Sequence, residues 1–512
     1  MPTLRVSHGV AGIIAGLAGL AASHATALVM TPLRPVPFAL VMDLVVRYTP
    51  GAVATWIIDV LGPLDKPLLV AVVTVGMVLL FLTAGRLALR AWWAPVPVYA
   101  AMGAVGAWAV LVRYDDRLVD YVPPTVGAVV AIVVLSLLTH PMRDTGDDVD
   151  GETRRGVLLR AGLVGAGAVG AVVVGQVVGQ GKLRVERARR LLNLPVTSPR
   201  LPYYVRLQGE GLSPWQTPNR DFYRIDTAVI TVPAVEPGSW RLRIHGMVER
   251  ELVLTYQDLL DRRIVEDWIT LNCVSNRVGG DLVGNAWWSG VPLGALLREA
   301  GVAGDADAVL QTSADGWTCG TPLRALTDGR NALLAIAMNG DALPLEHGFP
   351  VRTIVPGLYG YVSACKWVVD LEVTRFDRFD AYWVRQGWAE EAPVKIASRV
   401  DVPRPGEEVP SGRARVGGVA WYQHVGIDGV EYALDGGPWL RAETGGVVEH
   451  PRGADNVDTW VQWAATLDLE PGDHSLRVRA LGRDGTVQTG AETAPHPDGA
   501  TGWHEVEFTA TE

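Results

Sequence analysis

Only three cysteines occur among the 512 residues, so the chain cannot build a disulfide framework. It contains neither a G-x-G-x-x-G fingerprint nor a P-loop, and a nucleotide-dependent mechanism therefore has no support in the sequence. The formal net charge is -10, and no clustered basic face or nucleic-acid module is present. These features argue against nucleic acid as a partner.

What the sequence has in excess is apolar residues, which make up 49% of the chain and give it a mean hydropathy of +0.19. The excess lies almost wholly before residue 181, which indicates a part that sits in lipid. A helix needs roughly 20 apolar residues to cross about 30 Å of hydrocarbon. Five runs are predicted to form such helices, at residues 10–30, 68–89, 93–112, 125–140 and 157–178. Charged residues interrupt the stretch 35–64, which is predicted to form one or two amphipathic surface helices, with a sixth crossing as the alternative.

The orientation of these helices follows from the Lys and Arg residues of their short loops. With the N-terminus inside, Arg86 falls on the cytoplasmic side, the loop 113–121 faces outward, and everything after residue 181 is extracytoplasmic. One feature disagrees, because five basic residues between 182 and 190 would then lie outside. The segment 153–159, with Arg154 and Arg155, resembles an embedded twin-arginine export signal. The alternative, a pair of arginines that marks the cytoplasmic end of a helix, predicts the same multi-pass topology in the cell membrane.

Three further regions follow the predicted transmembrane domain at residues 1–181. Residues 182–218 are predicted to be a linker. Strands and short helices alternate irregularly over residues 219–395, which predicts a mixed α+β domain. Residues 396–512 change to short alternating strands with turn signals, which predicts an Ig-like β-sandwich of about seven strands. The predicted fold class is therefore multi-domain: an all-α transmembrane bundle, an α+β domain and a β-sandwich.

Cys273 follows an apolar-alternating strand and precedes a glycine-rich loop. A thiol in this place can be a soft metal ligand, a nucleophile or a small buried hydrophobe. Thr270, Cys273, Asn276 and Arg277, followed by W-x-G-V-P-L at residues 288–293, resemble the molybdenum-ligand loop of the sulfite oxidase family of molybdopterin enzymes. The resemblance implies that Cys273 is the thiolate that binds molybdenum and that Asn276 and Arg277 shape its loop.

The resemblance continues in order through the rest of the predicted α+β domain. It implies pterin or phosphate contacts at Asn219, Tyr223, Arg224, Ser313, His347, Arg352, Ser363 and Lys366. The chemistry agrees, because a dianionic phosphate needs cationic donors such as the fork of Arg352 and the point charge of Lys366. Taken singly, Arg352 could be a surface ion pair, His347 a satisfied core histidine and Lys366 a solvated strand end. Their ordered occurrence favours a site for a molybdenum-molybdopterin cofactor.

Two residues of the family's sulfite-oxidising branch are missing. The second arginine of its cysteine loop is Val278 here, and the segment 334–340 lacks the tyrosine that lies beside the metal. A small oxyanion such as sulfite is therefore a poor substrate prediction, and a neutral or larger substrate is favoured. The periplasmic methionine-sulfoxide reductase branch also lacks these groups but ends without an added C-terminal domain. Residues 396–512 resemble the dimerisation domain of sulfite oxidases and plant-type nitrate reductases.

We therefore predict a membrane-anchored, extracytoplasmic molybdopterin-dependent oxidoreductase that performs oxygen-atom transfer or related two-electron chemistry. The expected partners are a small-molecule substrate, a cytochrome or quinone that exchanges electrons, membrane lipid and a second copy of the chain. The alternative is a non-catalytic membrane receptor or scaffold with a degenerate core.

His24 and His140 are interpreted as helix-interface or headgroup residues rather than a haem site, with a weak electron-transfer role left open. Cys319 and Cys365 are interpreted as separate buried thiols, with a disulfide as the minor alternative.

Overall fold

The computed structural model of the chain describes residues 2–30, 36–49, 53, 65–112, 118–139, 181–228, 232–449 and 453–512. The chain divides into two compact units. The helical unit comprises Met1–Arg187, Asp226–Ala234 and Ala314–Trp317, and the β-rich unit comprises Ala188–Ile225, Val235–Ser313 and Thr318–Glu512. Several predictions, namely the helix at 157–178, the export-like signal with Arg154 and Arg155, and the role of His140, lie outside the described residues.

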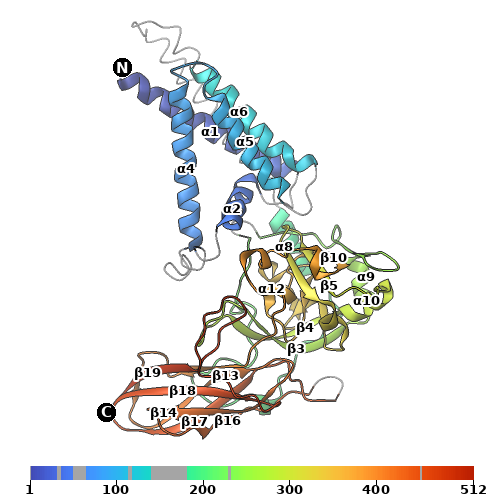
Figure 1. Cartoon of the computed structure of the whole chain (residues 1–512), viewed down its shortest axis with the longest axis vertical. Helices are drawn as coiled ribbons and strands as arrows, with labels where there is room; N and C mark the ends of the chain where they lie inside the picture. The colour runs from blue at the N-terminus through green and yellow to red at the C-terminus, as the bar shows by residue number, and fades with distance from the viewer. Residues whose placement is uncertain are drawn as a thin grey trace. The chain divides into compact units, whose positions relative to one another are not determined.

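The helical unit consists largely of apolar helices, drawn from blue to cyan in Figure 1. Those described are α1 (Pro2–Met30), α2 (Pro37–Tyr48), α4 (Asp65–Leu87), α5 (Val96–Leu111), the 3-10 helix η2 (Leu118–Tyr121) and α6 (Val122–Thr139). Among the described residues, three segments are long and apolar enough to cross a membrane, judged by length and composition: His8–Met30, Pro67–Leu87 and Leu118–Thr139. α5 is apolar but has only 16 residues, and α2 falls in the stretch predicted to be amphipathic. The number of crossings stays a prediction.

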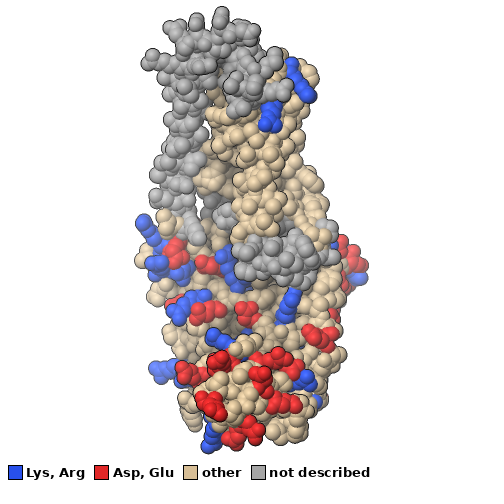
Figure 2. All heavy atoms as spheres, turned by 90° about the vertical axis from the view of Figure 1, so that its left-hand side faces the viewer, with Lys and Arg blue, Asp and Glu red and all other residues tan. Residues whose placement is uncertain are grey.

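Glycines let the long helices of this unit approach one another closely. A Cβ added to Gly12 of α1 would lie 2.1 Å from the carbonyl oxygen of Phe81 in α4. One added to Gly19 of α1 would lie 2.6 Å from the carbonyl oxygen of Gly127 in α6. α1 therefore packs with its backbone close to both neighbours. Figure 2 shows few charged side chains on the described part of these helices, on the face in view. Such a surface is suited to lipid.

The first part of the β-rich unit holds two sheets with short helices around them (Figure 1). One sheet has the order β2-β1-β10-β5-β6, and the other has the order β3-β4-β7-β8 with β9 paired to β7. The strands of the first are β1 (Arg241–Gly246), β2 (Leu252–Thr255), β5 (Ala308–Ser313), β6 (Thr318–Pro322) and β10 (Val368–Thr374). The strands of the second are β3 (Val265–Asn272), β4 (Val283–Pro292), β7 (Leu333–Met338), β8 (Asp341–Ala342) and β9 (Arg352–Ile354).

The helices of this part are short, so the predicted mixed domain is rich in strands. They are η3 (Tyr203–Val205), α9 (Tyr256–Leu260), α10 (Leu293–Ala300), α11 (Leu323–Thr327), η4 (Leu345–His347), α12 (Gly360–Ser363), η5 (Phe376–Arg378) and η6 (Val384–Gln386). A further helix, α8 (Gly181–Leu191), begins in the helical unit and ends in the β-rich unit. α9 begins at a capping box in which Thr255 and Asp258 satisfy each other's backbone N–H groups. The pattern of residues 254–260, in which polar residues precede an apolar pair, is typical of such a capped helix.

The strands that lead to the site are buried on both faces. All six residues of β7 are buried, as are the last six of β3. β3 and β4 pair antiparallel, from Val265 opposite Gly290 to Asn272 opposite Val283. Because β3 is anchored along its whole length, it fixes where the next residue, Cys273, leaves the sheet.

The last part of the chain is a β-sandwich, drawn in orange and red in Figure 1. Its sheets have the orders β11-β13-β17-β16 and β12-β19-β18-β14-β15. The strands are β11 (Ala397–Val402), β12 (Glu408–Pro410), β13 (Gly412–Trp421), β14 (Ile427–Leu434), β15 (Leu440–Arg441), β16 (Glu443–Thr444), β17 (Val461–Leu469), β18 (Gly472–Gly482) and β19 (His504–Thr511). Apolar residues of both sheets, among them Val416, Trp463 and Val478, form one core between them. The described strands exceed the predicted number because β12, β15 and β16 have only two or three residues each, too few to show alternation.

The sandwich and the preceding sheets share one compact unit and are joined by buried polar contacts. The side chain of Asn456 donates to the carboxylate of Asp267 at 2.8 Å, and the N–H of Trp460 donates to the hydroxyl of Thr270 at 2.8 Å. The Thr270 N–H donates to the carbonyl oxygen of Asp458 at 2.9 Å. These contacts hold β3 against the sandwich. The domain boundary predicted at residue 395 stays a prediction.

Candidate active site

Cys273 lies in the loop that joins β3 to β4. Its N–H donates to the carbonyl oxygen of Leu282 at 2.9 Å, and Oδ1 of Asn276 accepts from the Leu282 N–H at 2.9 Å. The Gly280 N–H donates to the carbonyl oxygen of Arg277 at 2.9 Å. These bonds close the loop on itself, and the role of Asn276 in shaping the loop stays a prediction.

The thiol of Cys273 is buried, and the residue is 8% exposed. Burial raises the pKa of this thiol, whereas hydrogen bonds from the N–H and hydroxyl of Ser275 and the positive charge of Lys366 lower it. A thiol must lose its proton to bind a metal. The net shift is upward because burial outweighs Ser275 and Lys366, so a metal that binds Cys273 would have to displace the thiol proton.

Arg352, at the start of β9, is a buried cation with 4% exposure. Its Nη1 donates to the carbonyl oxygen of His347 at 3.2 Å and its Nη2 to that of Ala364 at 3.4 Å. Its guanidinium carbon lies 5.2 Å from the centroid of a Trp288 ring. Its Nε has no hydrogen-bond partner, and no carboxylate lies within ion-pair distance in the described ranges. Burial lowers the pKa of Arg352 to about 10.

Gly348 brings Arg352 and Lys366 together. Its φ is +106°, and an added Cβ would lie 3.0 Å from Cβ of Arg352 and 3.2 Å from Cα of Lys366. Only glycine adopts this conformation in so narrow a space without strain. Two cations of different geometry are thereby held next to each other.

His347 ends η4 and is also buried, with 4% exposure. Its Nε2 lies 3.1 Å from the carbonyl oxygen of Asn219, which only accepts, so we assign the ring proton to Nε2. Burial, followed by the charges of Lys366 and Arg352, lowers the pKa of His347 to about 3, and the ring is neutral at pH 7. Nδ1 is then a buried acceptor with no partner among the residues described.

Aromatic rings line the same region. Phe222 and Tyr223 stack with ring centroids 5.2 Å apart, and Phe222 meets His347 edge to face at 5.7 Å. Burial raises the pKa of Tyr223, and Cys273 acts in the same direction, whereas Arg352 lowers it. Tyr223 is therefore a neutral phenol within electrostatic reach of the thiol and the buried guanidinium.

The structure brings most of the predicted site residues together. Direct bonds, ring contacts or electrostatic effects join Cys273, Asn219, Tyr223, Arg224, Asn276, His347, Arg352 and Lys366. The structure places three predicted site residues outside this group. Arg277 is exposed, Ser313 is buried at the end of β5 opposite Val368, and Ser363 donates its hydroxyl to the carbonyl oxygens of Leu358 and Tyr359 at 3.1 and 2.9 Å.

Some residues at the site are not in the predicted set. The Oδ1 of Asn272, adjacent to Cys273, is buried with no partner among the described residues. Trp288 lies against Arg352, and Phe222 lies against His347. Each stands inside a motif that the sequence singles out, so nearness to the motif was the available signal. Cys319 and Cys365 are buried thiols without a disulfide, as predicted.

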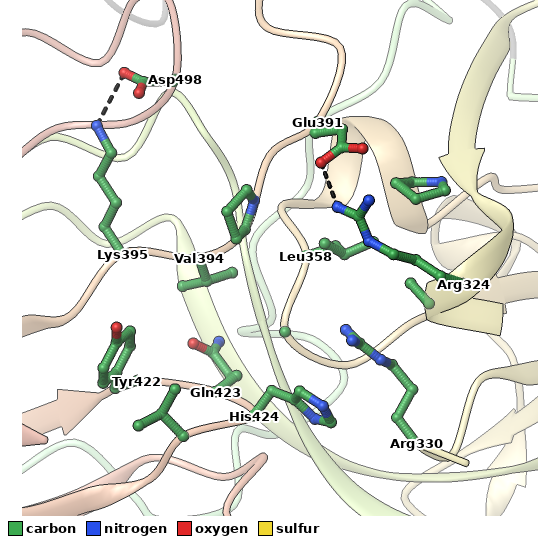
Figure 3. Close-up of a pocket in the computed structure, with 15 residues that line it drawn as sticks. Arg324, Arg330, Leu358, Glu391, Val394, Lys395, Tyr422, Gln423, His424 and Asp498 are labelled. Carbon is green, nitrogen blue, oxygen red and sulfur yellow. Dashed lines mark hydrogen bonds and ion pairs between the residues drawn. The ribbon is translucent and has the colours of Figure 1, made fainter. Parts of the chain in front are cut away.

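A separate cavity of about 360 Å³ lies where the sandwich meets the preceding sheets, beside Gly357. Figure 3 shows the ion pairs at its rim, Arg324 with Glu391 and Lys395 with Asp498. None of the predicted site residues is among those that line it. Because its lysine and one of its arginines are paired with acids across the rim, the cavity is not an evident site for a lone anion.

Comparisons with known proteins agree with this geometry. A family model described as the oxidoreductase molybdopterin binding domain matches residues 229–383. The chain is 31% identical over 300 residues to the sulfite oxidase of Gallus gallus, covering 50% of this chain and 64% of that protein. It is 32% identical over 149 residues to YuiH, an uncharacterised oxidoreductase of Bacillus subtilis (strain 168), covering 29% of this chain and 72% of that protein.

This chain belongs to the sulfite oxidase-type family of molybdopterin oxidoreductases. It spans 64% of the length of the Gallus gallus sulfite oxidase and 55% of the Homo sapiens one. Among solved structures, the sulfane dehydrogenase SoxCD of Paracoccus pantotrophus is similar, with 25% identity, a TM-score of 0.47, and coverage of 54% of this chain and 75% of that one. The predicted enzyme class and the molybdenum-molybdopterin cofactor are confirmed.

The residues present fit the cofactor of this sulfite oxidase-type family. The buried polar atoms without partners among the described residues include three from this site: one donor, Nε of Arg352, and two acceptors, Nδ1 of His347 and Oδ1 of Asn272. A pterin with a phosphate offers both N–H donors and anionic oxygens, and would satisfy both kinds. The buried thiol of Cys273 adds the soft ligand that molybdenum needs beside dithiolene sulfurs.

Proposed function

We propose that this protein is a membrane-anchored, extracytoplasmic oxidoreductase that transfers an oxygen atom between a molybdenum centre and a small neutral substrate, while two electrons pass in the opposite direction. The observation that carries the proposed site is Arg352. A buried guanidinium without a carboxylate is costly unless a ligand supplies negative charge. A phosphate beside Arg352 and Lys366 would supply it.

Each predicted site residue has a place in this proposal. Cys273 would bind the metal through its sulfur, and Asn276 and Arg277 would hold its loop. The pterin and its phosphate would contact Asn219, Tyr223, Arg224, Ser313, His347, Arg352, Ser363 and Lys366. When bound, the cofactor supplies the oxygen-atom exchange and stores two electrons.

The protein's own groups orient and protect this chemistry. The neutral His347 ring accepts through Nδ1, so it can receive an N–H of the pterin without adding charge. Ser275 and Lys366 stabilise the thiolate of Cys273. In the oxidising direction, the oxygen atom comes from water, and two electrons and two protons leave to an acceptor.

The substrate is proposed to be neutral rather than sulfite. The loop position at which the sulfite-oxidising branch has an arginine is Val278, whose Cγ2 would lie 3.3 Å from a Cβ added to Gly502 of the sandwich. The segment that carries the tyrosine in that branch is β7, which is aliphatic and buried throughout. Neither position offers a charge to a small oxyanion. Sulfoxides and N-oxides are suitable neutral oxygen donors.

The location and partners are further parts of the proposal. The three long apolar helices support membrane anchoring, and the loop charges support an extracytoplasmic site. Electrons would pass to or from a cytochrome or quinone. The sandwich would act as an Ig-like dimerisation domain.

Elemental analysis of the full-length protein in detergent tests the proposal. We expect about one molybdenum per chain, together with the fluorescence of the released, oxidised pterin. Cys273→Ser should abolish turnover of a sulfoxide, whereas Cys319→Ser, which changes a buried thiol elsewhere, should retain it. Well-folded protein that lacks both metal and pterin would contradict the proposal, and turnover of sulfite in preference to sulfoxides would contradict the substrate class.

A further inference from the structure

The C-terminal sandwich covers the loop that follows Cys273. Arg399 of β11 donates from Nη1 to the carbonyl oxygen of Gly280 at 2.8 Å and from Nη2 to the hydroxyl of Ser213 at 3.0 Å. Its Nε donates to Asp401 at 2.6 Å. The guanidinium is therefore fixed on three sides, and one of those sides is the loop.

His504, the first residue of β19, covers the same loop from a second direction. Its Nδ1 accepts from the N–H of Val400 at 2.9 Å, which holds the ring. A Cβ added to Gly279 would lie 2.2 Å from Cδ2 and Nε2 of this ring. The φ of Gly279 is +74°. The loop thus reaches the sandwich at a point where only glycine leaves room for the imidazole.

We propose that Arg399 and His504 are positioning residues, through which the sandwich sets the place of the Cys273 sulfur. This inference rests on the proposed function, in which Cys273 binds molybdenum. It gives the C-terminal domain a role inside each chain, in addition to any role between chains.

The route from the sandwich to Cys273 is short. Gly279 and Gly280 lie three and two residues before Leu282, and Leu282 makes one hydrogen bond with Cys273 and one with Asn276. A displacement of Gly279 or Gly280 must stretch these bonds, because β3 and β4 fix the two ends of the loop.

The test is Gly279→Ala in the full-length protein, read by hydrogen exchange at the N–H groups of Cys273 and Leu282. The new Cβ should push the loop from His504 and speed this exchange by about tenfold. The matched control is Gly406→Ala, because Gly406 has a φ of +71° with nothing within 4 Å of the added Cβ. It carries the same left-handed strain, and exchange in the Cys273 loop should stay within about twofold of the wild type.

A compensating change identifies the partner. His504→Ala removes the ring that the new Cβ meets, so the double variant Gly279→Ala with His504→Ala should exchange more slowly than Gly279→Ala alone. In the loaded enzyme, the electron paramagnetic resonance signal of the reduced molybdenum should shift in Gly279→Ala and return toward wild type in the double variant. A change of global stability alone would not produce that pattern.

The inference is wrong if Gly279→Ala behaves like Gly406→Ala, or if the double variant is no slower than the single one. If Gly279→Ala does not fold, the single variant His504→Ala tests the inference. We expect faster hydrogen exchange at the Leu282 N–H in this variant, and unchanged exchange would contradict the inference. Hydrogen exchange at the N–H groups of Cys273 and Leu282 can be measured whether or not the chain holds molybdenum. A chain that lacks metal but shows the expected exchange pattern would therefore overturn the proposed function and leave the loop contact standing.

Discussion

Replacing Arg352 by Met tests whether this arginine binds the cofactor or only stabilises the fold. Arg352 is buried without a carboxylate, and burial lowers its pKa from 12.5 to about 10. That difference corresponds to about 3 kcal/mol of cost for holding the charge in the folded chain. Because the group is a base with a lowered pKa, this cost is present at every pH below about 10 and is constant between pH 6 and 8.

In the cofactor-free chain, the stabilising and destabilising effects of Arg352→Met on the free energy of unfolding nearly cancel. Arg352→Met removes the charge cost of about 3 kcal/mol. It loses two hydrogen bonds to carbonyl oxygens, about 1 kcal/mol each, and a cation–π contact with Trp288 of about 1 kcal/mol. We therefore expect the free energy of unfolding of the cofactor-free variant to lie within about 1 kcal/mol of the wild type. The loaded variant should differ, since a hydrogen bond to a charged group is worth about 1.5–3 kcal/mol, or roughly 10- to 100-fold in cofactor retention.

Arg399→Met is the matched control. Arg399 is almost as buried as Arg352, but its Nε binds Asp401 at 2.6 Å, and the Asp401 side chain is only 7% exposed. Removing Arg399 leaves that carboxylate buried and unpaired, which should cost about 3–5 kcal/mol with or without cofactor.

The assay is chemical unfolding of cofactor-free chains at pH 7.5, with molybdenum per chain measured on proteins made in a cofactor-competent host. The reasoning is refuted if cofactor-free Arg352→Met loses as much stability as Arg399→Met, because Arg352 would then be structural. It is also refuted if Arg352→Met keeps a full complement of molybdenum.

Further predictions concern the thiol, a glycine and an ion pair. Cys273→Ser should lose the molybdenum while its free energy of unfolding stays within about 1 kcal/mol, whereas Cys319→Ser should keep the metal. Gly348→Ala should lower the molybdenum content, since its Cβ would crowd Arg352, and should cost at least about 1 kcal/mol on denaturant unfolding; retention of the full complement would count against the role of this contact. The Glu470 carbonyl oxygen and then Asp435 raise the pKa of His474. The stabilisation that these two partners give to protonated His474 is complete below pH 6.5 and is lost as the pH rises through the pKa of His474 in the folded chain. Asp435→Asn should therefore lower the free energy of unfolding by about 0.5 kcal/mol at pH 5.5 and by less at pH 8.5.

The sequence predicts those parts of the structure that depend on local pattern. The apolar runs predicted at residues 10–30, 68–89 and 125–140 overlap the described segments His8–Met30, Pro67–Leu87 and Leu118–Thr139. The alternation of apolar residues before Cys273 gives β3, and the polar pair Thr255 and Asp258 gives the start of α9. In each case the residues that determine the helix or strand lie within that element, so the sequence alone is enough to predict it.

The contacts that hold the Cys273 loop could not be predicted in this way. Arg399 and His504 reach Gly280 and Gly279 only because the sandwich folds back onto the loop. Neither residue stands in a motif, and Arg399 next to Asp401 has the spacing of an ordinary strand ion pair. The strand count was also underestimated, since strands of two or three residues carry no period. Such features depend on tertiary packing, which overrides local propensity.

The two buried arginines show why burial must be considered together with partners. Arg399 and Arg352 have similar exposure, so burial alone does not distinguish them. Arg399 has Asp401, a hydroxyl and a carbonyl, so its donors are largely satisfied within the chain. Arg352 has two carbonyl oxygens as partners, and its Nε has none. Because the chain bears the cost of that charge without an internal counter-ion, stability alone does not account for Arg352, whereas the proposed binding of an anionic group would account for it.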